Sequence, residues 1–218
     1  MTARSDAWSG RWCVDKLQEI GAISQIDVVH PNFLTVIHRD VGNIKLATMS
    51  VGRIDENELN GLLNGSDVDF VLNVSKEPYI TQGALQLAAQ GRFAIGGLGD
   101  AMRALRNGDT ATYLNPEISF ILQGLRQHSR VSSVARLDNR RFEIKRHGLE
   151  SVKLIALDEY ELTAEAVRNA IDSFPEFDAI LKSNPNGGIA DSSVSAASSA
   201  GIEIFKWGEL LGALNRNW

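Results

Sequence analysis

The chain has 218 residues, a formal net charge of −5, and hydrophobic and charged fractions of 44% and 22%, which are ordinary for a soluble globular protein. The acidic balance argues against a general nucleic-acid binder, and the absence of any run of about 18 apolar residues excludes a membrane-spanning helix. The first residues lack an apolar signal region and the single cysteine, Cys13, cannot form an internal disulfide, so we expect a cytoplasmic protein. The scattered histidines have no zinc-ligand spacing.

The first half of the chain predicts helices that alternate with short strands. Trp12, Leu17 and Ile20 share a helical spacing, and Asp55 is a suitable N-cap for a later helix. The expected elements are a helix at 8–20, strands at 33–39 and 44–51, a helix after Asp55, a strand at 69–74, a helix at 80–90, a strand at 92–95 and a helix at 100–106. Antiparallel hairpin strands come first, and parallel strands joined by crossover helices come last.

After a polar seam at 107–110, the second half repeats this order. The expected elements are a helix at 117–128, strands at 131–137, 141–146 and 152–157, a helix after the N-cap Thr163, a strand at 177–182, a helix at 190–199, a strand at 202–205 and a helix at 209–214. In each half this order favours a mixed sheet covered by helices.

The two halves also match in sequence. Residues 69–107 align without a gap on residues 178–216, at a constant offset of 109 residues. The identical pairs are Asp69/Asp178, Leu72/Leu181, Ile80/Ile189, Ala88/Ala197, Ile95/Ile204, Gly99/Gly208, Ala104/Ala213 and Leu105/Leu214. Upstream the match continues with a slip of one residue. We therefore expect an α/β protein of two tandem-duplicated repeats, 1–109 and 110–218, related by pseudo-twofold symmetry, with two versions of any functional site.

The last part of the second half resembles a known family. It contains Phe177–Lys182 before a polar loop, then Ala196 and Ala197, then the strand Ile202–Phe205, and finally Glu209-Leu-Leu in the last helix. This succession resembles the end of the Mrr-like restriction endonucleases of the PD-(D/E)XK superfamily. The resemblance implies two restriction-endonuclease-like units. It also implies an active site with an Asp and an (Asp/Glu)-x-Lys on adjacent strands, where carboxylates hold a divalent metal and the lysine assists the attacking water.

The catalytic pattern of that family is degenerate in this chain. The strands in which the family would place it, 44–50 and 152–158, contain no acid-x-Lys. The only acid-x-Lys is Glu143-Ile-Lys145, one strand earlier, with Asp138 upstream of it. Strand alternation puts Glu143 and Lys145 on one face. Asp138, Glu143 and Lys145 are therefore the catalytic candidates of a magnesium-dependent nuclease; a solvent-facing strand of alternating charge is the other interpretation.

Basic side chains are concentrated between residues 126 and 146, where only Asp138 and Glu143 oppose them. They are Arg126, Arg130, Arg136, Arg140, Arg141, Lys145 and Arg146. A local basic face on an acidic protein is compatible with phosphate binding, and the six arginines are the candidate nucleic-acid contacts. A solvated hairpin, or one that docks on an acidic partner, would give the same pattern.

Two loops that precede helices are candidate anion sites. Lys182, Asn184 and Asn186 belong to the loop after the strand at 177–182, and Lys76 belongs to the matching loop of the first half. Loops at the carboxyl ends of parallel strands lead into helix N-termini, where anions bind well. Ordinary turn chemistry is the alternative explanation of the Asn-Pro and Asn-Gly-Gly sequences.

Three functions follow as hypotheses. The first is a non-catalytic, nuclease-like protein that binds nucleic acid or acts as an accessory factor in genome defence or a mobile element, without a cofactor. The second is a nuclease that uses the second repeat only, with Mg²⁺. The third is an interaction subunit or inhibitor that binds a protein partner and no nucleic acid.

Overall fold

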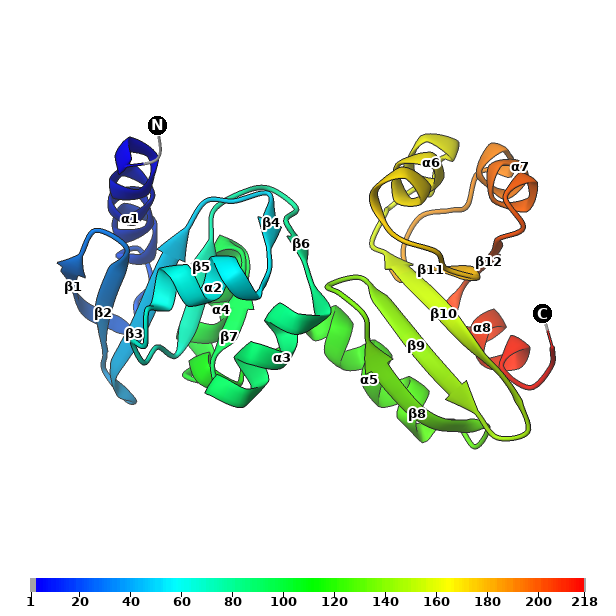
Figure 1. The fold of residues 1–218 in the computed structure, drawn as a ribbon, viewed down its shortest axis with the longest axis horizontal. Coiled ribbons are helices and arrows are strands. Elements are labelled where there is room, and N and C mark those ends of the chain that lie inside the picture. Colours follow the sequence, from blue (N-terminus) through cyan, green and yellow to red (C-terminus); the bar gives the residue numbers. More distant parts are fainter. Residues whose placement is uncertain (1–2, 218) are drawn as a thin grey trace. The chain divides into compact units, whose positions relative to one another are not determined.

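Each half of the chain forms its own five-stranded mixed sheet (Figure 1). The computed structural model describes residues 3–217. The chain divides into two units, Met1–Asn115 and Pro116–Trp218.

The segment before the second unit is held by a helix of the first unit. The hydroxyl of Tyr113 donates a hydrogen bond to Asp100 Oδ1 at 2.7 Å, and Asn115 Nδ2 donates to the same oxygen at 3.1 Å. Arg103 donates in turn to the Tyr113 hydroxyl at 3.0 Å. Residues 110–115 therefore pack with the first unit, although the expected repeat boundary stood just before them.

In its described part, the first unit has twelve elements in an order close to the expected one. They are α1 (Ala3–Leu17), β1 (Ile23–His30), β2 (Phe33–His38), β3 (Gly42–Met49), β4 (Arg53–Ile54), α2 (Glu56–Leu63), β5 (Phe70–Asn73), β6 (Tyr79–Ile80), α3 (Gln82–Gly91), β7 (Ala94–Gly96), α4 (Leu98–Asn107) and the 3-10 helix η1 (Thr110–Thr112). The main sheet has the order β1-β2-β3-β5-β7. Its first three strands are antiparallel, and β3, β5 and β7 are parallel.

The second unit has the same sheet order. Its elements are α5 (Pro116–Gln127), β8 (Val131–Arg136), β9 (Arg141–Arg146), β10 (Leu149–Leu157), α6 (Ala164–Ser173), β11 (Ala179–Lys182), α7 (Asp191–Ser199), β12 (Glu203–Phe205) and α8 (Trp207–Ala213). The sheet runs β8-β9-β10-β11-β12, with antiparallel pairs up to β10 and parallel pairs after it.

Helices cover both faces of each sheet, because the strands are apolar on both sides where they run parallel. In the first unit α1 and α4 pack on one face, and α2 and α3 pack on the other. In the second unit α5 and α8 cover one face, while α6 and α7, which lie side by side in Figure 1, cover the other. The strands β5 and β11 are buried along their whole length, as expected for central parallel strands.

The predicted N-caps are confirmed. Asp55 accepts hydrogen bonds from the N–H groups of Asn57 and Glu58, and Thr163 accepts one from Ala166. Strand β1 was not predicted. It is an edge strand whose side chains after Ile23 are mostly exposed, so it lacks the apolar alternation that identifies a half-buried strand. No helix among residues 3–217 is long and apolar enough to span a membrane.

Candidate functional site

Polar side chains of the second unit gather where β10 and β11 end. These strands are parallel and finish at Leu157 and Lys182, and ligand sites of open α/β sheets lie outside the carboxyl ends of such strands. The turn between β8 and β9 reaches the same edge, since Ala156 N–H donates to the carbonyl of Arg140 at 2.9 Å. A ligand site of the second unit is therefore expected at this edge of the sheet.

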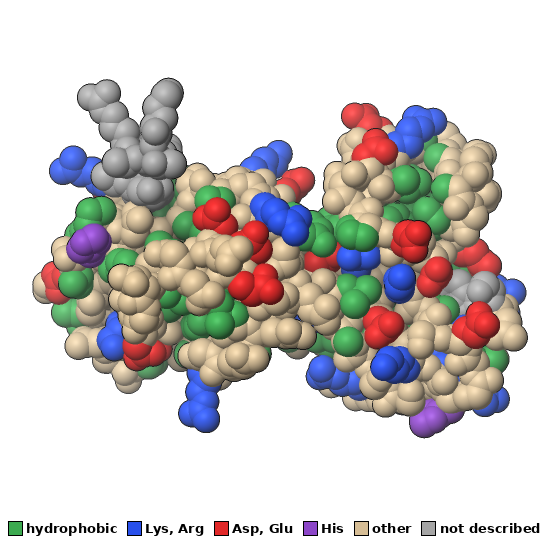
Figure 2. All heavy atoms as spheres, in the orientation of Figure 1, with side chains coloured by type: hydrophobic (Ala, Val, Ile, Leu, Met, Phe, Trp, Pro, Cys, Tyr) green, Lys and Arg blue, Asp and Glu red, His purple; other side chains and the backbone are tan. Residues whose placement is uncertain are grey.

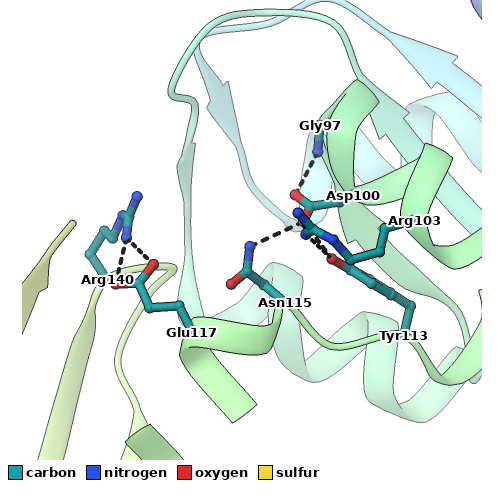
Figure 3. Close-up of polar contacts among 7 residues, drawn as sticks. All are labelled: Gly97, Asp100, Arg103, Tyr113, Asn115, Glu117 and Arg140. Carbon is teal, nitrogen blue, oxygen red and sulfur yellow. Dashed lines mark hydrogen bonds and ion pairs between the residues drawn. The ribbon is translucent and has the colours of Figure 1, made fainter. Parts of the chain in front are cut away.

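Glu117, Arg140 and Ser183 form a hydrogen-bonded cluster at this edge. Arg140 donates from one nitrogen to both carboxylate oxygens of Glu117, at 2.9 and 3.2 Å, and Figure 3 shows this pair. Ser183 Oγ donates to Glu117 Oε1 at 2.5 Å. Glu117 lies in the first turn of α5, where the helix dipole favours a negative charge. The cluster joins α5, the β8–β9 turn and the loop after β11, so its first effect is to hold these segments together.

Asp138, the first catalytic candidate, has a structural role. Its carboxylate is fully buried and accepts hydrogen bonds from the N–H groups of Arg140 and Arg141, at 2.8 and 2.7 Å. Arg141 Nε donates to the second oxygen at 2.6 Å. Arg141 also donates to the carbonyl of Glu176 at 2.9 Å. Both oxygens of Asp138 are thus used to close the turn and to neutralise a buried guanidinium.

Glu143 and Lys145 lie on one face of β9, as strand alternation requires. Glu143 is half-buried and stands opposite Lys153 of β10, and Lys145 is exposed. Among residues 10–217, whose side chains the structure describes, no group of three or more His, Cys, Asp or Glu side chains is arranged to hold a metal ion. The acid-x-Lys strand is present, but it shares no described metal-ligand cluster with Asp138.

The basic residues between 126 and 146 fall into separate environments. Arg146 is buried and donates to the carbonyls of Glu150 and Arg216, at 2.8 and 2.7 Å; desolvation lowers its pKa below the usual value. With Arg141 bound to Asp138 and Arg140 bound to Glu117, these three arginines are occupied within the protein.

Arg136 is a partly exposed cation on β8. Burial lowers the pKa of Arg136 to about 10, against a smaller opposing effect from the charge of Asp138. Its Nε atom is buried and has no hydrogen-bond partner in the described part of the chain. This guanidinium is therefore desolvated without full compensation.

Arg126, Arg130 and Lys145 are the exposed members of the set. None of their side chains forms an ion pair with the side chains described for residues 10–217. Arg126 lies in the last turn of α5, and Arg130 lies three residues beyond the end of that helix at Gln127. On the face drawn in Figure 2, basic and acidic side chains are interspersed over the second unit rather than separated. Of the expected local basic face, these three cations are exposed and free of described ion pairs.

The loop after β11 is organised by a buried lysine. Lys182 is 3% exposed, and its ammonium group donates to the carbonyls of Asn184 and Asn186, at 2.6 and 2.5 Å. Asn184 Oδ1 accepts from the N–H of Asn186 at 3.0 Å. The structure brings these three predicted anion-binding residues together, but they hydrogen-bond to one another, as ordinary turn chemistry would have them do.

The matching loop of the first unit is built differently. Asn73 occupies the position of Lys182 and is buried; its amide exchanges hydrogen bonds with the backbone of Val51, at 3.0 and 2.9 Å. Lys76 is exposed in the loop beyond it. The two units therefore share the position of this loop but not its charge.

A feature that sequence reasoning missed lies on α5 and α8. The rings of Phe120 and Trp207 are 4.9 Å apart, at an interplanar angle of 50°. They border an open pocket of about 400 Å³, and Phe120 is 57% exposed. The pocket is lined by Phe120, Gln123, Gly124, Gln127, His128, Trp207 and Leu211. The available signal was the spacing of Phe120, Gln123 and Gln127 along one side of a helix, which carries an aromatic ring outside the apolar core stripe.

Glu117 and Ser183 were also missed. They lie 66 positions apart, and only the general rule about carboxyl ends of parallel strands points to Ser183. Comparison of the chain with protein-family models, with curated proteins and with solved structures finds no match. The geometry of the second unit therefore carries the argument about function.

Proposed function

We propose that this protein is a tandem duplication of a nuclease-like unit that binds nucleic acid through its second unit without cleaving it. The nuclease-like unit is supported by the order of its helices and strands along the chain. A helix, three antiparallel strands, a crossover helix and a parallel strand follow one another in both units, as the restriction-endonuclease-like resemblance implies.

Equivalent strand registers support the duplication. Thr35 pairs with Lys45 in one sheet, and Glu143 pairs with Lys153 in the other, both at an offset of 108 positions. The isolated bridge between Leu162 and Ile189 has the place of the β4–β6 pair. Two unrelated α/β units would share an element order more readily than they would share a register.

The observation that carries the binding proposal is that two exposed cations, Arg126 and Arg130, lie at and just after the end of α5. Arg126 and Arg130 are exposed and have no described ion-pair partner, and no acidic side chain lines the pocket on α5 and α8. Exposed, uncompensated arginines are the groups that bind phosphates and release counterions. This local surface outweighs the net acidity of the chain, since attraction at contact distance is set by nearby charges.

Cleavage receives less support. Asp138 is engaged by Arg140 and Arg141, and the described residues contain no metal-ligand cluster. We therefore propose an accessory or regulatory role, and we retain cleavage only as an outcome of the test below.

The test is fluorescence anisotropy with labelled duplex and single-stranded DNA and RNA at two salt concentrations, with and without Mg²⁺. The double substitution Arg126→Ala/Arg130→Ala should weaken binding to all sequences alike and lower the salt slope by about 2. Arg168→Ala, an exposed arginine on α6, is the matched control and should change little. No binding of any nucleic acid at low salt would reject the proposal and leave the protein-partner hypothesis. Shortening of the labelled strand in the presence of Mg²⁺ would indicate a nuclease.

A further inference from the structure

The pocket on α5 and α8 combines an exposed aromatic ring with hydrogen-bonding side chains. Phe120 is 57% exposed, although burying a phenylalanine side chain is favourable by about 1.5–3 kcal/mol. Gln123 and Gln127 follow it on the same side of α5 and also line the pocket. The line from Phe120 to Gln127 is about 10 Å long at the rise of an α-helix.

The shape of this surface depends on a glycine. A Cβ atom at Gly124 would lie 2.2 Å from Cζ2 of Trp207. The absence of a side chain there lets the indole lie against α5, where it supports the ring of Phe120. Trp207 packs against the core of the second unit, so the aromatic floor of the pocket is fixed while Phe120 faces outward.

The carboxyl end of α5 is fixed by His128. Its Nδ1 accepts a hydrogen bond from the N–H of Arg130 at 3.2 Å, so Nε2 carries the proton that it shares with the carbonyl of Leu211 at 3.0 Å. This arrangement ties the start of the Arg130 segment to α8. The backbone of Arg130, just beyond the helix that lines the pocket, is therefore held in a fixed position.

The composition of the surface decides what it fits. A purely apolar partner surface would leave Gln123 and Gln127 without hydrogen bonds, and a basic partner would meet Arg126 and Arg130. An occupant with a flat ring, polar ring edges and negative charge satisfies all of these groups. Nucleobases stack on aromatic side chains and carry polar edges, and the phosphates beside them are anionic.

We propose that this surface binds single-stranded nucleic acid, with a base stacked on Phe120, amide contacts from Gln123 and Gln127, and phosphates near Arg126 and Arg130. The strand must be single because the faces of bases in a duplex are already stacked on one another. This inference rests on the proposed function and adds the substrate class, which the exposed arginines alone do not determine.

The experiment compares two labelled 12-mers of equal charge, an oligothymidine and an abasic strand of the same length. The wild-type protein should bind the oligothymidine at least about tenfold more tightly, since stacking on one aromatic side chain has that magnitude. Phe120→Ala should remove this difference, and Phe120→Trp should keep it. Val194→Ala removes exposed apolar surface from α7, on the other face of the sheet, and should leave the difference intact.

The outcomes separate this inference from the proposed function. If the Arg126→Ala/Arg130→Ala protein loses affinity but Phe120→Ala binds like wild type, the arginines bind phosphate and the stacking proposal is wrong. Equal binding of the two 12-mers by wild type, or binding of duplex alone, also rejects stacking while leaving the proposed function in place. Absence of all binding at low salt rejects both. Circular dichroism of Phe120→Ala and Phe120→Trp checks that each variant is folded.

Discussion

Asp69 and Asp178 make the same hydrogen bonds in the two units. Asp69 Oδ2 accepts from the N–H of Lys45 at 2.7 Å, and Asp178 Oδ2 accepts from the N–H of Lys153 at 2.6 Å. In each case the aspartate N–H also donates to the carbonyl of the same lysine, at 2.8 Å. In each unit the aspartate thus fixes the register of the first parallel pair of strands, β3–β5 or β10–β11, from the residue just before the pairing starts.

The first prediction is that Asp69→Ala and Asp178→Ala destabilise the protein equally. Each substitution leaves a strand N–H without its partner, which costs about 1 kcal/mol of unfolding free energy. Urea denaturation monitored by circular dichroism measures the loss.

Asp67→Ala is the control for Asp69→Ala. Asp67 forms an ion pair with Lys45 at 3.3 Å, and its side chain is 85% exposed, so its removal should change stability by less than about 0.5 kcal/mol. A loss at Asp69 that matched the loss at Asp67 would mean that the register bond has no stabilising effect.

The second prediction concerns Asp138 and Arg141. Their side chains are 0% and 8% exposed, and Asp138→Ala would leave a buried guanidinium without its carboxylate. We expect a loss of about 3–5 kcal/mol. Glu143→Gln, on the neighbouring strand, should cost under about 1 kcal/mol because Glu143 is only half-buried. Thermal and urea unfolding of both variants compare the two sites.

A double substitution checks the cause. If the cost arises from an unpaired buried charge, Asp138→Ala/Arg141→Met should be less destabilised than the sum of the two single variants. Additive losses would instead assign the effect to the backbone bonds that Asp138 makes in the turn. Either result bears on the nuclease hypothesis, because a carboxylate required for folding is poorly placed to exchange its arginine for a metal.

Sequence patterns predicted the order of helices and strands because most elements have a buried face and a local start signal. Asp55 and Thr163 are examples of such signals, and β11 is an example of a strand that is buried along its whole length. The edge strand β1 lacks both. The sequence therefore predicted the elements whose buried residues recur with the period of a helix or a strand. It did not predict β1, which is held mainly by backbone pairing.

The candidate site was harder to predict from the sequence, because atoms far away in the chain determine whether a charged side chain is exposed or bound within the protein. Arg146 shares the core face of β9 with Phe142 and Ile144, so alternation alone could have identified it as buried. Arg141 could not be identified in this way. It binds the carbonyl of Glu176, 35 positions away, and no local pattern encodes that contact.

The third prediction is an alkaline loss of stability caused by Cys13. The thiol is buried, and desolvation raises its pKa from 9.0 to about 12. A raised pKa stabilises the folded state below pH 9, and this contribution is lost as the pH rises from about 9 to about 12. Between about pH 8 and about pH 10.5 the wild type should lose about 2 kcal/mol more than Cys13→Ala loses.

Tyr113 is the main confounding group in that experiment. Burial and the hydrogen bond to Asp100 raise its pKa to about 12, so it acts in the same direction above pH 10. A Tyr113→Phe background removes this effect from both proteins. Equal pH dependence of the wild type and Cys13→Ala in that background would show that the thiol does not titrate as its burial requires.

The last prediction concerns glycines in the helices. Gly124→Ala should destabilise the protein by about 1–3 kcal/mol, because the new methyl group overlaps the Trp207 ring and the ring must move.

Gly99→Ala and Gly208→Ala are controls from α4 and α8, where an added Cβ meets nothing within 4 Å. There the better helix propensity of alanine should leave stability unchanged or raise it by up to about 1 kcal/mol. Urea unfolding followed by fluorescence measures the stability, and the combined emission of the four tryptophans includes that of Trp207. A Gly124→Ala protein with wild-type stability and an unchanged emission spectrum would show that α5 and α8 do not pack as described, and the aromatic pocket would lose its structural basis.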